Sequence, residues 1–224
     1  MLINIAIADE HPLIRRGLCA LIEGAGHSDS GSGIDPVYSI TGEVGSTRAL
    51  FALLADNTPE ILLLGYTLNT AQPSGRSGEA DGLALIKGLS QKYPALNMIL
   101  VAPFKSPQLI RLAIEAGAKG YISHTVSDRS LHDALTCVMK GEVYIEPTLM
   151  KGFLQCEESL SAREIDVLRL LCKGGSLTDV SRQMHLSIKT VSAHKIRAME
   201  KLRVKNDCQL YCLLARTRMF EIAF

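Results

Sequence analysis

The chain has 224 residues, a formal net charge of +1 and 47% hydrophobic residues, enough apolar sequence for one large domain or two ordinary ones. Its uninterrupted apolar stretches, such as 61–64 and 98–103, are far shorter than the roughly 18–20 residues that a membrane-spanning helix needs. No charged, apolar and small-residue leader is visible, so we expect a cytoplasmic protein with no membrane partner.

Charges divide unevenly along the chain. Residues 1–150 hold 11 Lys and Arg against 15 Asp and Glu, whereas residues 151–224 hold 13 against 8. An acidic front part followed by a basic back part is typical of a regulatory domain joined to a nucleic-acid-binding domain.

The first 140 residues alternate short apolar runs with amphipathic stretches. The predicted strands are 3–8, 40–44, 61–64, 98–102 and 120–122, and the predicted helices are 12–23, 47–55, 82–92, 107–116 and 128–140. Apolar runs without alternation, separated by helices, indicate a parallel sheet covered on both faces. We therefore expect a doubly wound, five-stranded parallel α/β domain over residues 1–141.

In such a sheet, functional residues lie at the carboxyl ends of the strands. Those ends carry Asp9, Glu10, Gly65, Ala102 and His124. Segments 24–36 and 69–80 are rich in Gly, Ser and other polar residues and predict exposed loops, and residues 142–159 predict a linker.

Residues 160–224 predict a small all-α domain. Ser161-Ala-Arg-Glu164 reads as a capping box at the start of a first helix, and Ser176 opens a second, shorter helix. Ser187 caps a third helix that runs to about Leu202, and Asp207 starts a fourth that ends near Met219.

This helical region carries the residues on which a resemblance to a known family rests. They are Leu160 to Glu164, Val167-Leu168, Gly174, Leu186 to Val191, His194, Lys201-Leu202 and Val204. The region resembles the LuxR-type helix-turn-helix that closes response regulators of the NarL/FixJ family, and it looks most like the RcsB branch. The resemblance implies binding to double-stranded DNA and dimer contacts from the helix that begins at Asp207.

Helical spacing assigns the roles on the third helix. Val191, Ala198 and Leu202 share one stripe that must face the domain core. The opposite stripe is predicted to read bases in the major groove, and its members are Lys189, Ser192, Ala193 and Ile196. The residues predicted to contact phosphates are Thr190, Lys195, Arg197, Lys201 and Lys205. The alternative is a helical interaction domain with a solvated basic face.

The front domain resembles a receiver domain over roughly residues 1–141. Asp9-Glu10 matches the acidic pair that helps to hold Mg²⁺ in phosphorylatable receivers, and the segments 81–83 and 115–121 also match. The departures fall where chemistry would occur: Gly65 replaces the phosphorylated aspartate, Ala102 the hydroxyl residue, and His124 the lysine.

Each departure removes a chemical function. Without a carboxylate at position 65 there is no nucleophile toward a phosphoryl donor and one fewer oxygen ligand for Mg²⁺. We therefore predict a pseudo-receiver with a degenerate phosphorylation site, no cofactor, no bound metal and no enzymatic activity. Three alternatives stay open: weak cation binding by Asp9 and Glu10, metal-assisted hydrolysis by the same pair, and a small ligand anchored by Asp9 and His124.

Together these features predict a bacterial transcription regulator that acts without aspartyl phosphorylation. We expect a homodimer on a roughly palindromic site. The alternative is an auxiliary co-regulator that binds DNA as a heterodimer with a true response regulator. Helices 12–23 and 128–140 are both candidates for the dimer contact, and the sequence does not choose between them.

The six cysteines lie in helical patterns and form no CxxC pair. We expect them to be mostly small buried apolar residues. Cys208 and Cys212 lie one helical turn apart, which leaves a metal or redox role open for this pair.

Overall fold

The structure, a computed structural model, describes residues 2–24, 37–68, 82–103, 105–154, 158–217 and 220. Apart from Gly24, the two predicted loops 24–36 and 69–80 lie outside these residues. The chain divides into two compact units, one of residues 1–105 and 113–150 and the other of residues 106–112 and 151–224.

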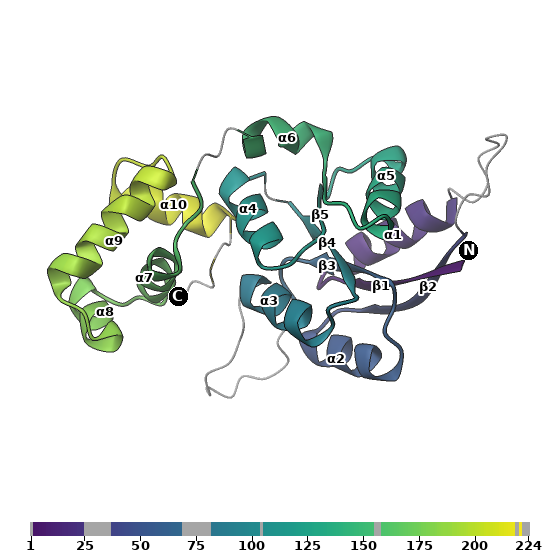
Figure 1. The fold of residues 1–224 in the computed structure, drawn as a ribbon, viewed down its shortest axis with the longest axis horizontal. Coiled ribbons are helices and arrows are strands. Elements are labelled where there is room, and N and C mark those ends of the chain that lie inside the picture. Colours follow the sequence, from purple (N-terminus) through teal and green to yellow (C-terminus); the bar gives the residue numbers. More distant parts are fainter. Residues whose placement is uncertain are drawn as a thin grey trace. The chain divides into compact units, whose positions relative to one another are not determined.

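A parallel sheet forms the centre of the first unit (Figure 1). Its strands are β1 (Leu2–Ala8), β2 (Val37–Val44), β3 (Ile61–Gly65), β4 (Asn97–Ala102), β5 (Gly120–Ser123) and β6 (Tyr144–Ile145), in the order β2-β1-β3-β4-β5-β6. The doubly wound α/β fold is therefore confirmed, with six strands among the described residues where the sequence predicted five. β6 has only two residues, too few to produce a readable apolar pattern.

Helices cover both faces of this sheet. α1 (Pro12–Gly24) and α5 (Asp128–Met139) pack on one face against alternate strand residues such as Ile5, Leu63 and Val101. α2 (Thr47–Asp56) and α3 (Gly82–Lys92) lie on the opposite side (Figure 1). α4 (Pro107–Glu115) precedes β5. Because successive side chains of a strand point to opposite faces, the interior strands are apolar on both.

The segment predicted as a linker has structure of its own. It contains β6 and α6 (Pro147–Leu154), and the division between the two units falls after Met150. Glu146 follows β6 and accepts hydrogen bonds from the Ser123 amide at 2.7 Å and from the Thr148 hydroxyl at 2.6 Å. This carboxylate ties the end of β6 to the end of β5 and to the first turn of α6.

The second unit ends in four helices: α7 (Ala162–Cys172), α8 (Leu177–Met184), α9 (Ile188–Lys201) and α10 (Asp207–Thr217). The predicted capping box of Ser161 and Glu164 is present, and Ser176 and Asp179 form a second one. Val167, Leu171, Val180 and Val191 form a shared core for α7, α8 and α9. The predicted helix boundaries are thus confirmed to within a few residues.

Candidate nucleic-acid interface and the polar network beside β3

A three-residue turn joins α8 to α9. His185 ends α8 in the left-handed conformation with φ 54°, and the Ser187 hydroxyl caps α9 by accepting from the Thr190 amide at 3.1 Å. Two helices joined by a short, sharply turned connection form a helix-turn-helix, whose second helix can enter a DNA groove.

One face of α9 points into the domain and the other lies open. Val191 and Ala198 are fully buried, as the spacing predicted. On the other side Lys189 and Ala193 are exposed, Ser192 is half-buried, and the Ile196 side chain is 51% exposed. The structure therefore places the four predicted base-reading residues on one face of α9, where the isoleucine is about half exposed.

The residues predicted to contact phosphates fall into two groups. Arg197 and Lys205 are exposed, and Thr190 lies in the first turn of α9. By contrast, Lys195 is only 11% exposed and its Nζ lies 2.6 Å from Asp207 Oδ2 at the start of α10. This ion pair links α9 to α10, so the Lys195 ammonium already has an anionic partner within the domain.

Lys201 is also bound inside the domain. Its Nζ donates to Glu164 Oε2 at 3.0 Å and to the Ser159 carbonyl at 3.1 Å, and its side chain is 20% exposed. The same Glu164 oxygen accepts from the Ser161 amide at 2.8 Å, so the capping box of α7 and the end of α9 share one buried carboxylate. Burial alone would raise the pKa of Glu164, but these hydrogen bonds outweigh burial and lower the pKa below its ordinary value.

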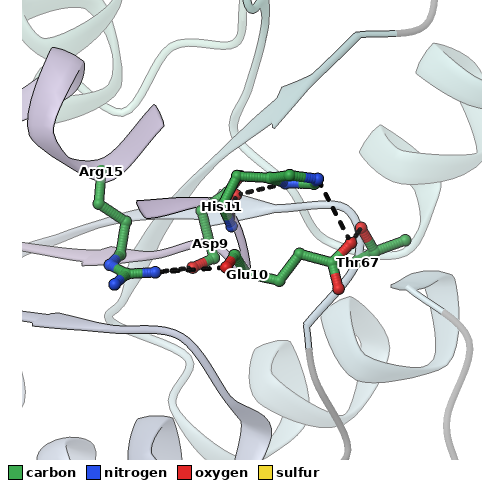
Figure 2. A network of polar contacts seen from close by, with 5 residues as sticks. All are labelled: Asp9, Glu10, His11, Arg15 and Thr67. Atoms are coloured by element: carbon green, nitrogen blue, oxygen red, sulfur yellow. Dashed lines mark hydrogen bonds and ion pairs between the residues drawn. The ribbon is translucent and has the colours of Figure 1, made fainter. Parts of the chain in front are cut away.

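The first unit carries a polar network at the carboxyl end of β1, beside β3. Figure 2 shows Asp9, Glu10, His11 and Arg15 from the β1–α1 segment, with Thr67 just after β3. Asp9 is 3% exposed, and its Oδ1 accepts from the His11 amide at 2.7 Å and lies 3.0 Å from His11 Nδ1. Buried carboxylates require such partners, and here the partners come from the same loop.

Asp9 also fills the space beside Gly65. A Cβ added at position 65 would overlap Asp9 Oδ2 and lie 2.8 Å from Asp9 Cγ, which is closer than real Cβ contacts. Position 65 therefore has no room for any side chain while Asp9 keeps this conformation. This order of strands places Asp9 and Gly65 at the point where the chain reverses its direction of winding, the usual ligand site of such sheets.

The second acidic residue is held as well. Glu10 Oε1 accepts from the Thr67 hydroxyl at 2.5 Å, and His11 Nε2 lies 3.9 Å from the same oxygen. Arg15 Nη1 donates to the Asp9 carbonyl at 2.8 Å, which fixes the backbone of the loop. Hydrogen bonds within the protein thus engage Asp9 Oδ1 and Glu10 Oε1.

Ala102 and His124 are the two remaining positions of the predicted degenerate phosphorylation site, and neither adds a charge. Ala102 is fully buried at the end of β4. His124 is half-buried after β5, and desolvation lowers its pKa despite the opposing attraction of Asp9. A lowered pKa keeps the imidazole neutral at pH 7, so His124 supplies no counter-charge to a phosphoryl group there.

Within the described residues, no group of three or more His, Cys, Asp or Glu side chains is arranged to hold a metal ion. No helix in the same part of the chain has the length and apolarity needed to cross a membrane.

Comparison with known proteins decides the class of the molecule. The family described as bacterial regulatory proteins, luxR family, matches residues 158–214. The chain is 29% identical to the transcriptional regulatory protein UhpA of Escherichia coli K12 over 98% of this chain and 99% of that one. It is 25% identical to the oxygen regulatory protein NreC of Staphylococcus epidermidis over 97% and 99%. Residues 158–214 therefore form a luxR-type DNA-binding domain, and the whole chain is similar to transcription factors of the LuxR/NarL response-regulator type.

Solved structures agree with this assignment. The regulator superposes with a TM-score of 0.67 on a structure of two RcsB dimers bound to two parallel DNAs, at 26% identity over 96% of this chain and 98% of that one. A Salmonella RcsB bound to a promoter in the presence of a phosphomimetic gives the same TM-score and identity over 95% and 97%. The predicted resemblance is thereby confirmed, and the relatives are transcription regulators rather than enzymes.

The sequence did not reveal which residues bind the acidic pair Asp9-Glu10 or the lysines Lys195 and Lys201. His11, Arg15 and Thr67 were not predicted to hold the acidic pair, although His11 directly follows it in the sequence. The anions that bind Lys195 and Lys201 were missed too, because they lie 12 and 37 residues away and follow no helical period.

Proposed function

We propose that the regulator binds a roughly palindromic DNA site as a homodimer in the cytoplasm and acts without aspartyl phosphorylation. The observation that carries this proposal is the relationship between Asp9 and Gly65. Residue 65 has no carboxylate to accept a phosphoryl group, and the Asp9 carboxylate occupies the space that a Cβ at position 65 would need.

The surroundings of position 65 support the same proposal. Magnesium prefers oxygen ligands that keep near-octahedral geometry. Here Asp9 Oδ1 accepts from His11 and Glu10 Oε1 accepts from Thr67, so one oxygen of each carboxylate is already hydrogen-bonded within the protein. Ala102 and the neutral His124 leave a phosphoryl oxygen without a hydroxyl donor or a positive counter-charge.

For DNA contact we propose Lys189, Ser192, Ala193 and Ile196 as base readers. Lysine can donate to guanine acceptors, serine can bond either way, and the two apolar side chains can meet a thymine methyl group. We retain Thr190, Arg197 and Lys205 as phosphate contacts. For Lys195 and Lys201 we propose a structural role instead, since both ammonium groups are bound to carboxylates of their own domain.

A competition experiment tests DNA recognition. Binding of the full chain to a selected palindromic duplex and to a random duplex is measured at several salt concentrations. We expect preference for the selected duplex to persist as salt rises, because base contacts depend less on counterion release than phosphate contacts do. Equal retardation of both duplexes at moderate salt would contradict sequence-specific regulation.

The second candidate is a co-regulator that binds DNA only together with a true response regulator. A contact through α1, where Leu13 is 85% exposed, fits this candidate and the homodimer equally. Size measurement of the purified protein, alone and with candidate regulators, separates the two proposals. A stable homodimer that binds DNA alone excludes the co-regulator as the main mode of action.

A further inference from the structure

Two thiols stand apart from the other cysteines. Of the five cysteines that the structure describes, Cys208 and Cys212 are exposed, whereas Cys19 and Cys137 are half-buried and Cys172 is buried. Burial raises the pKa of Cys172 to about 11 and also raises the pKa of Cys19 and Cys137. Because the thiolate is the form that binds metals, the three covered cysteines are poor ligands.

The exposed pair belongs to α10, the yellow helix of the second unit (Figure 1). Leu210 and Leu214 of the same helix are fully buried and hold it to its domain. Cys208 and Cys212 are four residues apart, so they share the exposed stripe with Tyr211 between them. Their exposure leaves both thiols outside the core of their own domain.

Helix geometry decides what this pair can do. Side chains at positions i and i+4 have Cβ atoms about 5–6 Å apart. A disulfide requires a Cβ separation of roughly 3.5–4.5 Å, so the two cysteines cannot form one within an intact helix. A metal–thiolate bond is about 2.3 Å long, so two sulfurs on opposite sides of one ion lie about 4.6 Å apart. That separation is within reach of both side chains.

The number of ligands then selects the cation. Zinc in structural sites takes four ligands, and among the described residues of one chain no group of three or more His, Cys, Asp and Glu is arranged to hold a metal ion. Asp207, the adjacent carboxylate, is bound to Lys195. Soft thiolates favour Cu(I), a cation that two thiolates can satisfy.

We propose that Cys208 and Cys212 form a two-thiolate chelate for one soft monovalent cation of the Cu(I) class on each chain. Binding replaces the two thiol protons, which pass to solvent, and forms two metal–sulfur bonds without any change of oxidation state. This site is separate from the proposed DNA-reading face and does not depend on the loss of phosphorylation.

The test is a titration of the reduced full chain with Cu(I) under anaerobic conditions, in competition with a coloured Cu(I) chelator. We expect one tightly held Cu(I) per chain. Cys208→Ser and Cys212→Ser should each weaken binding by more than the roughly 10–100-fold that changes around a metal's ligands cause. Cys19→Ser and Cys137→Ser are the matched controls and should leave the affinity unchanged.

Folding is checked separately by circular dichroism and thermal unfolding. Because both thiols are exposed, neither substitution should lower the midpoint of unfolding. Unchanged Cu(I) affinity in Cys208→Ser or Cys212→Ser, or an equal loss in Cys137→Ser, would overturn the proposal. A stoichiometry of one Cu(I) per two chains would overturn the claim that one chain completes the site.

Discussion

The carboxylate of Asp9 occupies the space that a side chain at position 65 would need, since a Cβ placed on Gly65 would lie 2.8 Å from Asp9 Cγ. Loss of the side chain at one strand end is thus matched by inward placement of a carboxylate from the neighbouring strand. Restoring an aspartate at position 65 would therefore put two carboxylates in one buried space.

Gly65→Asp is expected to destabilise the protein and not to restore phosphoryl acceptance. Overpacking in a filled interior costs about 1–3 kcal/mol, and repulsion between like charges adds to it. Chemical unfolding measures the first effect, and mass spectrometry after incubation with acetyl phosphate measures the second. Gly88→Asp is the matched control, because a Cβ at Gly88 meets nothing within 4 Å. Equal stability of the two variants would contradict the crowding argument.

Lys201→Ala is expected to lower stability more than DNA affinity. The substitution leaves the buried Glu164 carboxylate without its cation, which costs about 1–3 kcal/mol. Sequence alone predicts the opposite, a uniform loss of DNA binding with a flatter salt dependence. Lys205→Ala serves for comparison, because Lys205 is exposed and its loss should reduce the salt slope by about one without destabilising the domain. A flattened salt slope in Lys201→Ala at unchanged stability would restore the phosphate-contact role.

The pH dependence of unfolding should report on Glu164. Its pKa is lower in the folded chain than in the unfolded one, so its stabilising contribution is fully present above about pH 4.5 and disappears as pH falls through the folded pKa. Glu164→Gln should remove this part of the acid destabilisation, so the difference in stability between the variant and the parent should shrink on acidification. A difference that stays constant from pH 7 to about pH 3 would show that Glu164 does not titrate in this way.

Two apolar residues of α9 should give opposite results. Val191 is fully buried, so Val191→Ala should cost about 1–3 kcal/mol of stability. Ile196 is exposed, so Ile196→Ala should change stability by less than about 0.5 kcal/mol and relax the sequence preference. Thermal unfolding and duplex binding separate the two effects.

Thymine contact by Ile196 can be tested on the DNA itself. Replacing each thymine of the selected site by uracil removes one methyl group, and loss of its burial costs about 0.8 kcal/mol, roughly fourfold in affinity. We expect at least one position where the parent protein responds and Ile196→Ala does not. Parallel responses of the two proteins at every thymine would exclude this contact.

The fold could be predicted from sequence because its signals are local. The apolar runs of β1, β3 and β4 and the caps at Ser161, Ser176 and Ser187 each lie within a few neighbouring residues. The exposed face of α9 followed from helical spacing in the same way. The two-residue strand β6 carries no such signal and was missed.

Long-range partners could not be predicted in this way. Lys195 and Lys201 have the composition of DNA-contacting residues, yet Asp207 and Glu164 bind them across the domain. Likewise, the absence of a carboxylate at Gly65 is visible in the sequence, but the inward position of Asp9 depends on how β1 and β3 pair. Charge and composition identify candidates, and only the packing shows which of them are already bound.

The most direct test of phosphorylation independence compares DNA occupancy with and without a phosphoryl donor. The full chain is incubated with acetyl phosphate and Mg²⁺, analysed by intact mass, and titrated onto its selected duplex beside an untreated sample. We predict no phosphorylated species and the same Kd in both samples. A stable acyl phosphate on residues 1–150 together with tighter binding to the duplex would contradict the account.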